Sequence, residues 1–168
     1  IPVIEDAAHA VGARYKGLNI GSISDFTMFS FQAIKHITTG DGGMLLLKNK
    51  HLQDKANRIR WFGIDRKSKQ AGIWENDITE IGYKYQMTDI AAAMGIASLS
   101  EFDEHSKLRK KLFGIYEEEL DGCERLKVVG GGFKDREHAA WLFTIIVEDR
   151  FTLQKKLRDN GIESNQVH

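Results

Sequence analysis

The stretch between residues 26 and 47 constrains the fold of this chain most strongly. Two apolar runs, at 26–31 and 43–47, have the length and composition of short β-strands, and a polar loop with a glycine-rich turn connects them. A third apolar run, at 3–6, precedes them. All three runs are apolar on both faces, which is typical of strands that lie beneath helices. The sequence therefore predicts the sheet core of an α/β domain.

Two ionisable residues follow these predicted strands. Asp6 ends the run at 3–6, and Lys35 lies in the loop after the run at 26–31. Open α/β sheets present functional groups from the carboxyl ends of their strands, and an amine that apolar groups shield from water can attack a carbonyl to form a Schiff base. Pyridoxal phosphate needs such an amine, an acid for its pyridine nitrogen and donors for its phosphate. The pair therefore points to this cofactor; taken singly, a structural lysine and a turn-capping aspartate are the alternatives.

Five ordered motifs resemble one known family. They are residues 5–10 (EDAAHA), 30–35 (SFQAIK), 38–43 (TTGDGG), 63–66 (GIDR) and 82–90 (GYKYQMTDI). In this order and at these spacings, the chain resembles the sugar aminotransferases of the DegT/DnrJ/EryC1/StrS family. The resemblance runs through essentially all 168 residues.

The resemblance implies an α/β fold, the aspartate aminotransferase fold (type I) of pyridoxal-phosphate-dependent transferases. Residues 1–100 are expected to be the C-terminal part of a mostly parallel large domain that binds the cofactor. Residues 101–168 are expected to be the linking helix and the start of the small C-terminal α/β domain. Because the chain begins inside a predicted strand without an initiator methionine, we expect an internal fragment of a longer protein.

The resemblance also implies roles for individual residues. Lys35 would hold the cofactor covalently, and Asp6 would pair with its pyridinium nitrogen, so that both are candidate catalytic residues. Ser30 resembles the family's phosphate-binding serine, and Gln32 would help to hold the phosphate or contact the substrate. His9 would lie against the cofactor ring or support Asp6, with a hydrogen-bonded core histidine as the alternative.

Three further residues complete the candidate site and its surroundings. The family frequently has Asn at the position of Lys84, and that Asn reaches across a dimer interface to the partner's cofactor phosphate. An ammonium is also a good phosphate ligand, so Lys84 is expected to bind the cofactor in a homodimer with shared active sites; a solvated loop lysine is the alternative. His168 matches a family histidine near the sugar substrate. His36, beside the lysine, is expected to support the backbone.

Composition argues against several classes of partner. Twenty-four basic residues balance 24 acidic residues, so no net charge attracts nucleic acid or an anionic membrane. Cys123 is the only cysteine, which excludes an intrachain disulfide, and the six histidines show no metal-ligand spacing. No apolar run approaches the roughly 20 residues of a membrane span. We therefore expect a cytoplasmic protein without a metal that binds neither nucleic acid nor membrane.

Periodicity predicts the remaining elements. Thr88 is a good N-cap for an alanine-rich helix, and an apolar stripe predicts that the next helix, from about 100 to 120, bridges the two domains. Residues 64–81 are expected to form a long polar loop. The other expected elements are a loop with a short strand between 7 and 25, a helix from residue 49 or 50 to Gly63, strands at 126–128, 140–147 and 162–167, and a helix at 151–159.

The expected activity is transfer of an amino group, with glutamate as the expected donor, to a keto carbon of a nucleotide-linked sugar. Such reactions serve cell-surface polysaccharide or secondary-metabolite sugar biosynthesis. A pyridoxal-phosphate-dependent nucleotide-sugar dehydratase of the same family is one alternative, but in that branch a histidine typically replaces the lysine found at 35. A non-catalytic nucleotide-binding module is another, but the chain has neither a P-loop nor a Rossmann glycine pattern.

Overall fold

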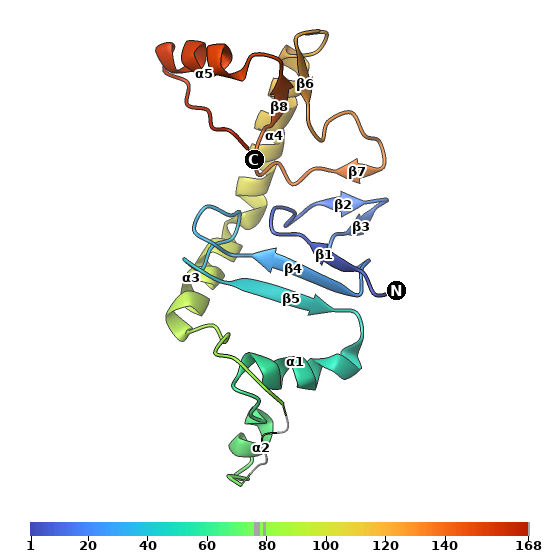
Figure 1. Ribbon diagram of the computed structural model, residues 1–168, viewed down its shortest axis with the longest axis vertical. Helices are drawn as coiled ribbons and strands as arrows, with labels where there is room; N and C mark the ends of the chain where they lie inside the picture. Colours follow the sequence, from blue (N-terminus) through green and yellow to red (C-terminus); the bar gives the residue numbers. More distant parts are fainter. Residues whose placement is uncertain (76–77, 79, 168) are drawn as a thin grey trace.

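The central sheet has three strands. The computed structural model describes residues 1–75, 78 and 80–167. In it, β1 (Ile4–Asp6), β4 (Phe26–Ser30) and β5 (Gly43–Leu47) lie in the order β1-β4-β5 (Figure 1). β1 is parallel to β4, whereas β5 is antiparallel to it. The predicted strands are confirmed, and the antiparallel pairing fits the connection between β4 and β5, a loop without the helix that a parallel crossover usually contains.

The helices begin and end close to the predicted residues. Thr88 caps α3, because its Oγ1 accepts a hydrogen bond from the Ala91 N–H (3.2 Å). The expected loop after Gly63 instead contains a short helix, because the Asp65 carboxylate accepts hydrogen bonds from the backbone of the first helical turn. The helices are η1 (Lys50–Leu52), α1 (Gln53–Arg60), α2 (Arg66–Gln70), α3 (Asp89–Ser100), α4 (Phe102–Glu119) and α5 (Arg150–Asp159). None of those in the described residues combines the length and hydrophobicity that crossing a bilayer requires.

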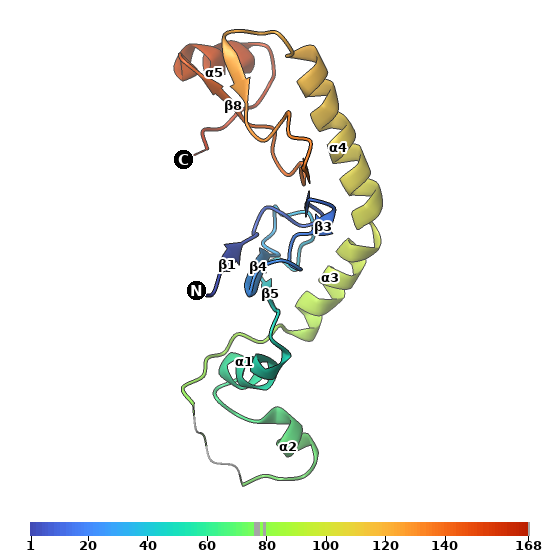
Figure 2. The same ribbon diagram turned by 90° about the vertical axis from the view of Figure 1, so that its right-hand side faces the viewer.

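One face of the central sheet is covered and the other is open. Thr27 is fully buried, whereas its neighbour Met28 is 43% exposed. The register pairs Glu5 with Thr27 and Asp6 with Met28, so Asp6 lies on the open face. Leu45, which pairs with Met28, is exposed as well. The prediction that helices bury both faces is therefore wrong for the described residues, where α3 and α4 run along the same side (Figure 2).

The loop between β4 and β5 is fixed at both ends. The Phe31 N–H donates to the Gly42 carbonyl (2.8 Å), and the Thr39 N–H donates to the Phe31 carbonyl (2.9 Å). The Thr38 N–H donates to the hydroxyl of Ser98 on α3 (3.2 Å). A side chain at Gly42 would collide with the Thr39 hydroxyl. The glycine turn thus lets β5 return beside β4 and holds the intervening loop in place.

Two further small sheets lie in the part of the chain that the structure describes. β2 (Arg14–Tyr15) pairs with β3 (Leu18–Asn19) and with β7 (Arg136–Glu137), so a late segment returns to the first part of the chain. β6 (Leu126–Val128) pairs with β8 (Ile145–Val147).

Two strand predictions for the C-terminal part need correction. The predicted strand at 140–147 is shorter than expected, because Ala140 has a φ of 55°, which interrupts extended backbone. The strand predicted at 162–167 is wrong, since these residues pair with no neighbouring strand in the part of the chain that the structure describes.

Candidate active site

Three of the predicted site residues lie at or just beyond the carboxyl ends of neighbouring strands. Asp6 is the last residue of β1, and Ser30 is the last residue of β4. Both side chains lie on the open face, because Asp6 pairs with Met28 and Ser30 is two residues further along β4. Lys35 is half-buried in the loop that follows. The fold thus brings a carboxylate, a hydroxyl and an amine to the same end of the sheet.

The Asp6 carboxylate combines a structural contact with an available oxygen. Its Oδ1 accepts a hydrogen bond from the Ala8 N–H (3.1 Å), which caps the turn after β1. Its Oδ2 accepts no hydrogen bond within residues 1–75, 78 and 80–167, and the side chain is exposed. The capping role and a charge-pairing role therefore use different oxygens, and Asp6 can perform both.

Ser30 and Gln32 shape the turn that leads to Lys35. The Gln32 N–H donates to the Ser30 Oγ (3.3 Å), and the Ile34 N–H donates to the Gln32 Oε1 (3.1 Å). The Lys35 N–H donates to the Gln32 carbonyl (2.9 Å). In these contacts both side chains act as acceptors. The Ser30 hydroxyl hydrogen and the Gln32 amide hydrogens remain able to donate to an anion.

The Lys35 amine lies over an aromatic ring from the other end of the chain. Its Nζ is 3.8 Å from the centroid of the Trp141 ring. The His9 ring also contacts Trp141, with centroids 3.8 Å apart and an interplanar angle of 30°. The Trp141 Nε1–H donates to the carbonyl of Ile34, 107 positions earlier in the chain (2.9 Å). Trp141 thus joins residues that follow β1 and β4.

Sequence reasoning missed this tryptophan. Trp141 lies in an apolar run that alternation assigned to a strand, and local spacing contains no information about a contact with Lys35. The available signals were weak: a tryptophan is costly to leave exposed, and its indole N–H needs a hydrogen-bond acceptor when it is buried.

His36 supports the backbone of the segment that carries Trp141. Its Nε2 donates to the Ala139 carbonyl (2.9 Å), which is the backbone-supporting role predicted for this residue. Burial and then the positive charge of Arg109 lower the pKa of His36. The ring is therefore neutral at neutral pH and donates from Nε2.

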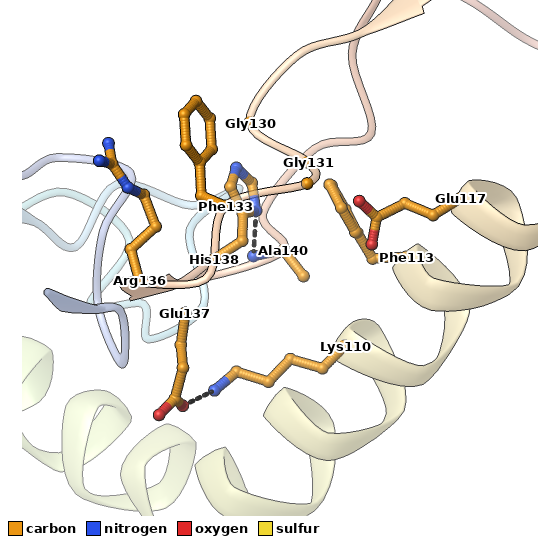
Figure 3. A pocket seen from close by; sticks show the side chains of 11 residues that line it. Lys110, Phe113, Glu117, Gly130, Gly131, Phe133, Arg136, Glu137, His138 and Ala140 are labelled. Atoms are coloured by element: carbon orange, nitrogen blue, oxygen red, sulfur yellow. Dashed lines mark hydrogen bonds and ion pairs between the residues drawn. The ribbon is translucent and has the colours of Figure 1, made fainter. Parts of the chain in front are cut away.

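A separate cavity of about 230 Å³ lies behind the same segment, between α4 and residues 130–140 (Figure 3). The His138 ring stacks on Phe113 at a centroid distance of 4.7 Å. Its Nδ1 accepts a hydrogen bond from the Ala140 N–H (2.8 Å). Burial lowers the pKa of His138, while the nearby Glu117 carboxylate acts in the opposite direction. The neutral imidazole is the form that can accept this bond.

Two predicted site residues lie outside this cluster. Lys84 is exposed, and its backbone pairs with Trp61 just after α1. Its segment runs beside α1, beyond β5 and away from β1 (Figure 1). Within the described residues, Lys84 forms no hydrogen bond or ion pair with Asp6 or Lys35. His168 lies outside the residues that the structure describes.

Residues 1–168 match the DegT/DnrJ/EryC1/StrS aminotransferase family. The chain belongs to this family. The resemblance of its motifs is thereby confirmed, and pyridoxal phosphate is the cofactor of the family's aminotransferases.

Relatives support both fold and family. The chain is 34% identical, over 93% of its length, to the UDP-4-amino-4,6-dideoxy-N-acetyl-beta-L-altrosamine transaminase of Campylobacter jejuni. It superposes on the sugar aminotransferase CalS13 of Micromonospora echinospora with a TM-score of 0.89 and 33% identity over 96% of the chain. It also superposes on the PLP-form of a putative sugar aminotransferase, Spr1654 of Streptococcus pneumoniae, with a TM-score of 0.81 and 32% identity over 98% of the chain. The expected fold is confirmed. The chain spans 40%, 43% and 43% of these relatives, less than half of each.

The donor and acceptor chemistry of the cluster fits pyridoxal phosphate. Lys35 provides an amine for the aldehyde, and the Asp6 Oδ2 is an available acceptor for a protonated ring nitrogen. The Ser30 hydroxyl and the Gln32 amide can donate to the phosphate. These four residues would hold the cofactor.

Proposed function

We propose that this chain forms the lysine-bearing part of a pyridoxal-phosphate-dependent aminotransferase that acts on nucleotide-linked keto sugars, with glutamate as amino donor. The observation that supports this most directly is the placement of Asp6 and Lys35 at neighbouring strand ends, in a member of an aminotransferase family. The name of the Campylobacter relative, a transaminase of a UDP-linked amino sugar, supports the substrate class.

Each residue of the cluster has a distinct task in this proposal. When bound, pyridoxal phosphate supplies a ring that accepts electrons from the carbon whose amino group is exchanged. The Asp6 Oδ2 holds the proton on the ring nitrogen, while the Ser30 Oγ and the Gln32 amide bind the phosphate. The Lys35 Nζ binds the cofactor covalently and, once released, moves a proton as a general base.

The identity of residue 35 favours amino transfer over sugar dehydration. A lysine can form the covalent link and exchange it with an incoming amine, whereas an imidazole can move protons but cannot form that link. The neighbouring His36 does not take this place, because its Nε2 donates to the Ala139 carbonyl.

Glutamate alone should convert the bound cofactor in the full-length protein. We expect the absorption band of the cofactor to shift within a single turnover, with one 2-oxoglutarate formed per active site and no sugar present. Addition of 2-oxoglutarate, which has no amino group to give, serves as the control and should leave the band unchanged. A band that responds to no amino donor, together with loss of a sugar hydroxyl, would place the protein in the dehydratase branch.

We also propose a homodimer in which Lys84 reaches the cofactor phosphate of the partner subunit. In its own chain Lys84 lies away from Lys35, and the segment that carries it exposes large apolar side chains: Tyr85 is 69% exposed and Ile90, on α3, is 78% exposed. Large exposed apolar side chains that gather in one segment are typical of protein interfaces. A lysine in such a segment is well placed to bind across the interface. We propose in addition that residues 1–100 form part of the large domain and that residues 101–168 form the linking helix and the start of the small domain.

Hybrid dimers test the shared site. Mixing full-length Lys35→Ala subunits with Lys84→Ala subunits should restore about half of the wild-type activity per hybrid, because one of its two sites then has both lysines. Each homodimeric variant alone provides the baseline. If mixing restores nothing although subunit exchange is seen by mass spectrometry, Lys84 does not act in the partner's site.

A further inference from the structure

We propose that Trp141 is a positioning residue for Lys35, and that its ring holds the lysine amine whenever this amine is not attached to the cofactor. The proposal rests on the proposed function, because only a reaction that releases the lysine requires such a place. It assigns a role to a residue outside the family motifs, in the segment between β7 and β8.

The contact between the two side chains is close and direct. The Lys35 Nζ lies 3.8 Å from the centroid of the Trp141 ring, well within the roughly 6 Å over which a cation is attracted to an aromatic face. Lys35 forms no ion pair within the described residues, and its side-chain amine contacts this ring. The position of the amine therefore depends on the position of the ring.

The ring itself is fixed from several directions. Its Nε1–H donates to the carbonyl of Ile34, the residue before the lysine (2.9 Å). The Trp141 carbonyl accepts a hydrogen bond from Arg109 Nη1 on α4 (3.2 Å). The His9 ring, tilted by 30° against the indole with the centroids 3.8 Å apart, supports it as well. The indole is thus a rigid surface that is tied to the same loop that carries Lys35.

The backbone before Trp141 is held in a conformation that few residues adopt. Ala140 has a φ of 55°, which costs free energy for a residue with a Cβ, and such backbone persists only where surrounding contacts enforce it. Here His138 accepts the Ala140 N–H, as Figure 3 shows, and His36 donates to the Ala139 carbonyl. The constrained turn aims the following indole at Lys35. Strain of this kind is typical of functional sites.

Amino-group exchange explains why the lysine needs this surface. The donor's amino nitrogen forms a bond to the cofactor carbon while the bond from this carbon to the Lys35 Nζ breaks. Nζ leaves as a free amine and takes up the proton that the donor's ammonium group has lost. The resulting ammonium is attracted to the face of Trp141, which keeps Nζ next to this carbon. Once it has given up a proton, the neutral amine can act as the general base and attack the carbon to close the cycle.

The test compares Trp141→Leu with Trp141→Phe in the full-length protein. The first readout is the NMR signal of the Lys35 ε-methylene in protein that carries ε-¹³C-labelled lysine and from which the cofactor has been removed, assigned with Lys35→Arg. The ring current of Trp141 should shift this signal upfield from the other lysines. Trp141→Leu should abolish the shift, and Trp141→Phe should keep part of it. A wild-type signal that coincides with those of exposed lysines overturns the proposal.

Kinetics provide the second readout. Trp141→Leu should lower kcat about tenfold with little change in the KM for the sugar, and Trp141→Phe should recover most of the loss. Trp74→Leu, at a tryptophan that is 74% exposed, is the matched control and should have no effect. Unchanged kcat in Trp141→Leu overturns the positioning role. If Trp141→Leu does not fold, the comparison of Trp141→Phe with wild type decides by the same two readouts. A shifted Lys35 signal in a protein that glutamate does not convert would refute the proposed function but not the contact.

Discussion

Replacing Lys35 by alanine should lower the rate of amino transfer by about 10³-fold or more, because it removes both the covalent attachment of the cofactor and the general base. Borohydride reduction of the wild-type protein should fix the cofactor on the peptide that contains Lys35, and mass spectrometry of the variant should find no such adduct. His36 cannot compensate, because its imidazole forms no stable link to an aldehyde and its Nε2 is engaged with the Ala139 carbonyl.

The matched control for this variant is Lys55→Ala, at an exposed position on α1. Its activity and its reductive labelling should equal those of the wild type. Normal labelling of the Lys35→Ala variant at another lysine would end the assignment of Lys35.

Replacing Asp6 by asparagine should leave the cofactor bound but lower kcat by about 10- to 150-fold. The structure indicates why the effect is selective. The Asn Oδ1 can still accept the Ala8 N–H that caps the turn after β1, so the fold at this point is retained. The other oxygen becomes an NH₂ group, which cannot accept the proton of the ring nitrogen. Loss of a charge-assisted hydrogen bond costs about 1.5–3 kcal/mol, and 1.4 kcal/mol corresponds to a factor of ten.

The measurement is steady-state kcat with the absorption spectrum of the bound cofactor, and thermal unfolding verifies the fold. Asp121→Asn, at an exposed position after α4, is the control. Near-normal turnover of Asp6→Asn would show that Asp6 acts only by accepting the Ala8 N–H that caps the turn after β1.

Local chemistry made part of the fold and of the site predictable. Residues only a few positions apart determine the strands, the Thr88 cap and the glycine turn before β5. Such short-range patterns can be recognised in the sequence itself. The same holds for the order of Asp6, Ser30 and Lys35 along neighbouring strand ends, although the roles of these residues remain predictions.

Contacts between distant segments were not predictable in this way. The period-two hydrophobic pattern predicts that Ala140 and Trp141 lie in a strand. Hydrogen bonds from the distant side chains of His36 and Arg109 hold the backbone there in another conformation. The short helix α2 was missed for a different reason. Asp65 is part of the motif at 63–66, and its carboxylate also caps this helix, which the polar, aperiodic composition of 64–81 does not indicate.

The near-continuity of α3 and α4 has a mechanical consequence. A single residue, Glu101, separates them, and α4 with its 18 residues extends about 27 Å beyond this joint. Such a rod acts as a lever, and each degree of rotation at Glu101 displaces its far end by about half an ångström. The Lys110–Glu137 ion pair (3.4 Å) joins α4 to β7, and β7 in turn pairs with β2. These contacts connect α4 to the first part of the chain. Because Arg109 on α4 donates to the Trp141 carbonyl, the surface over the Lys35 amine is connected mechanically to this long helix.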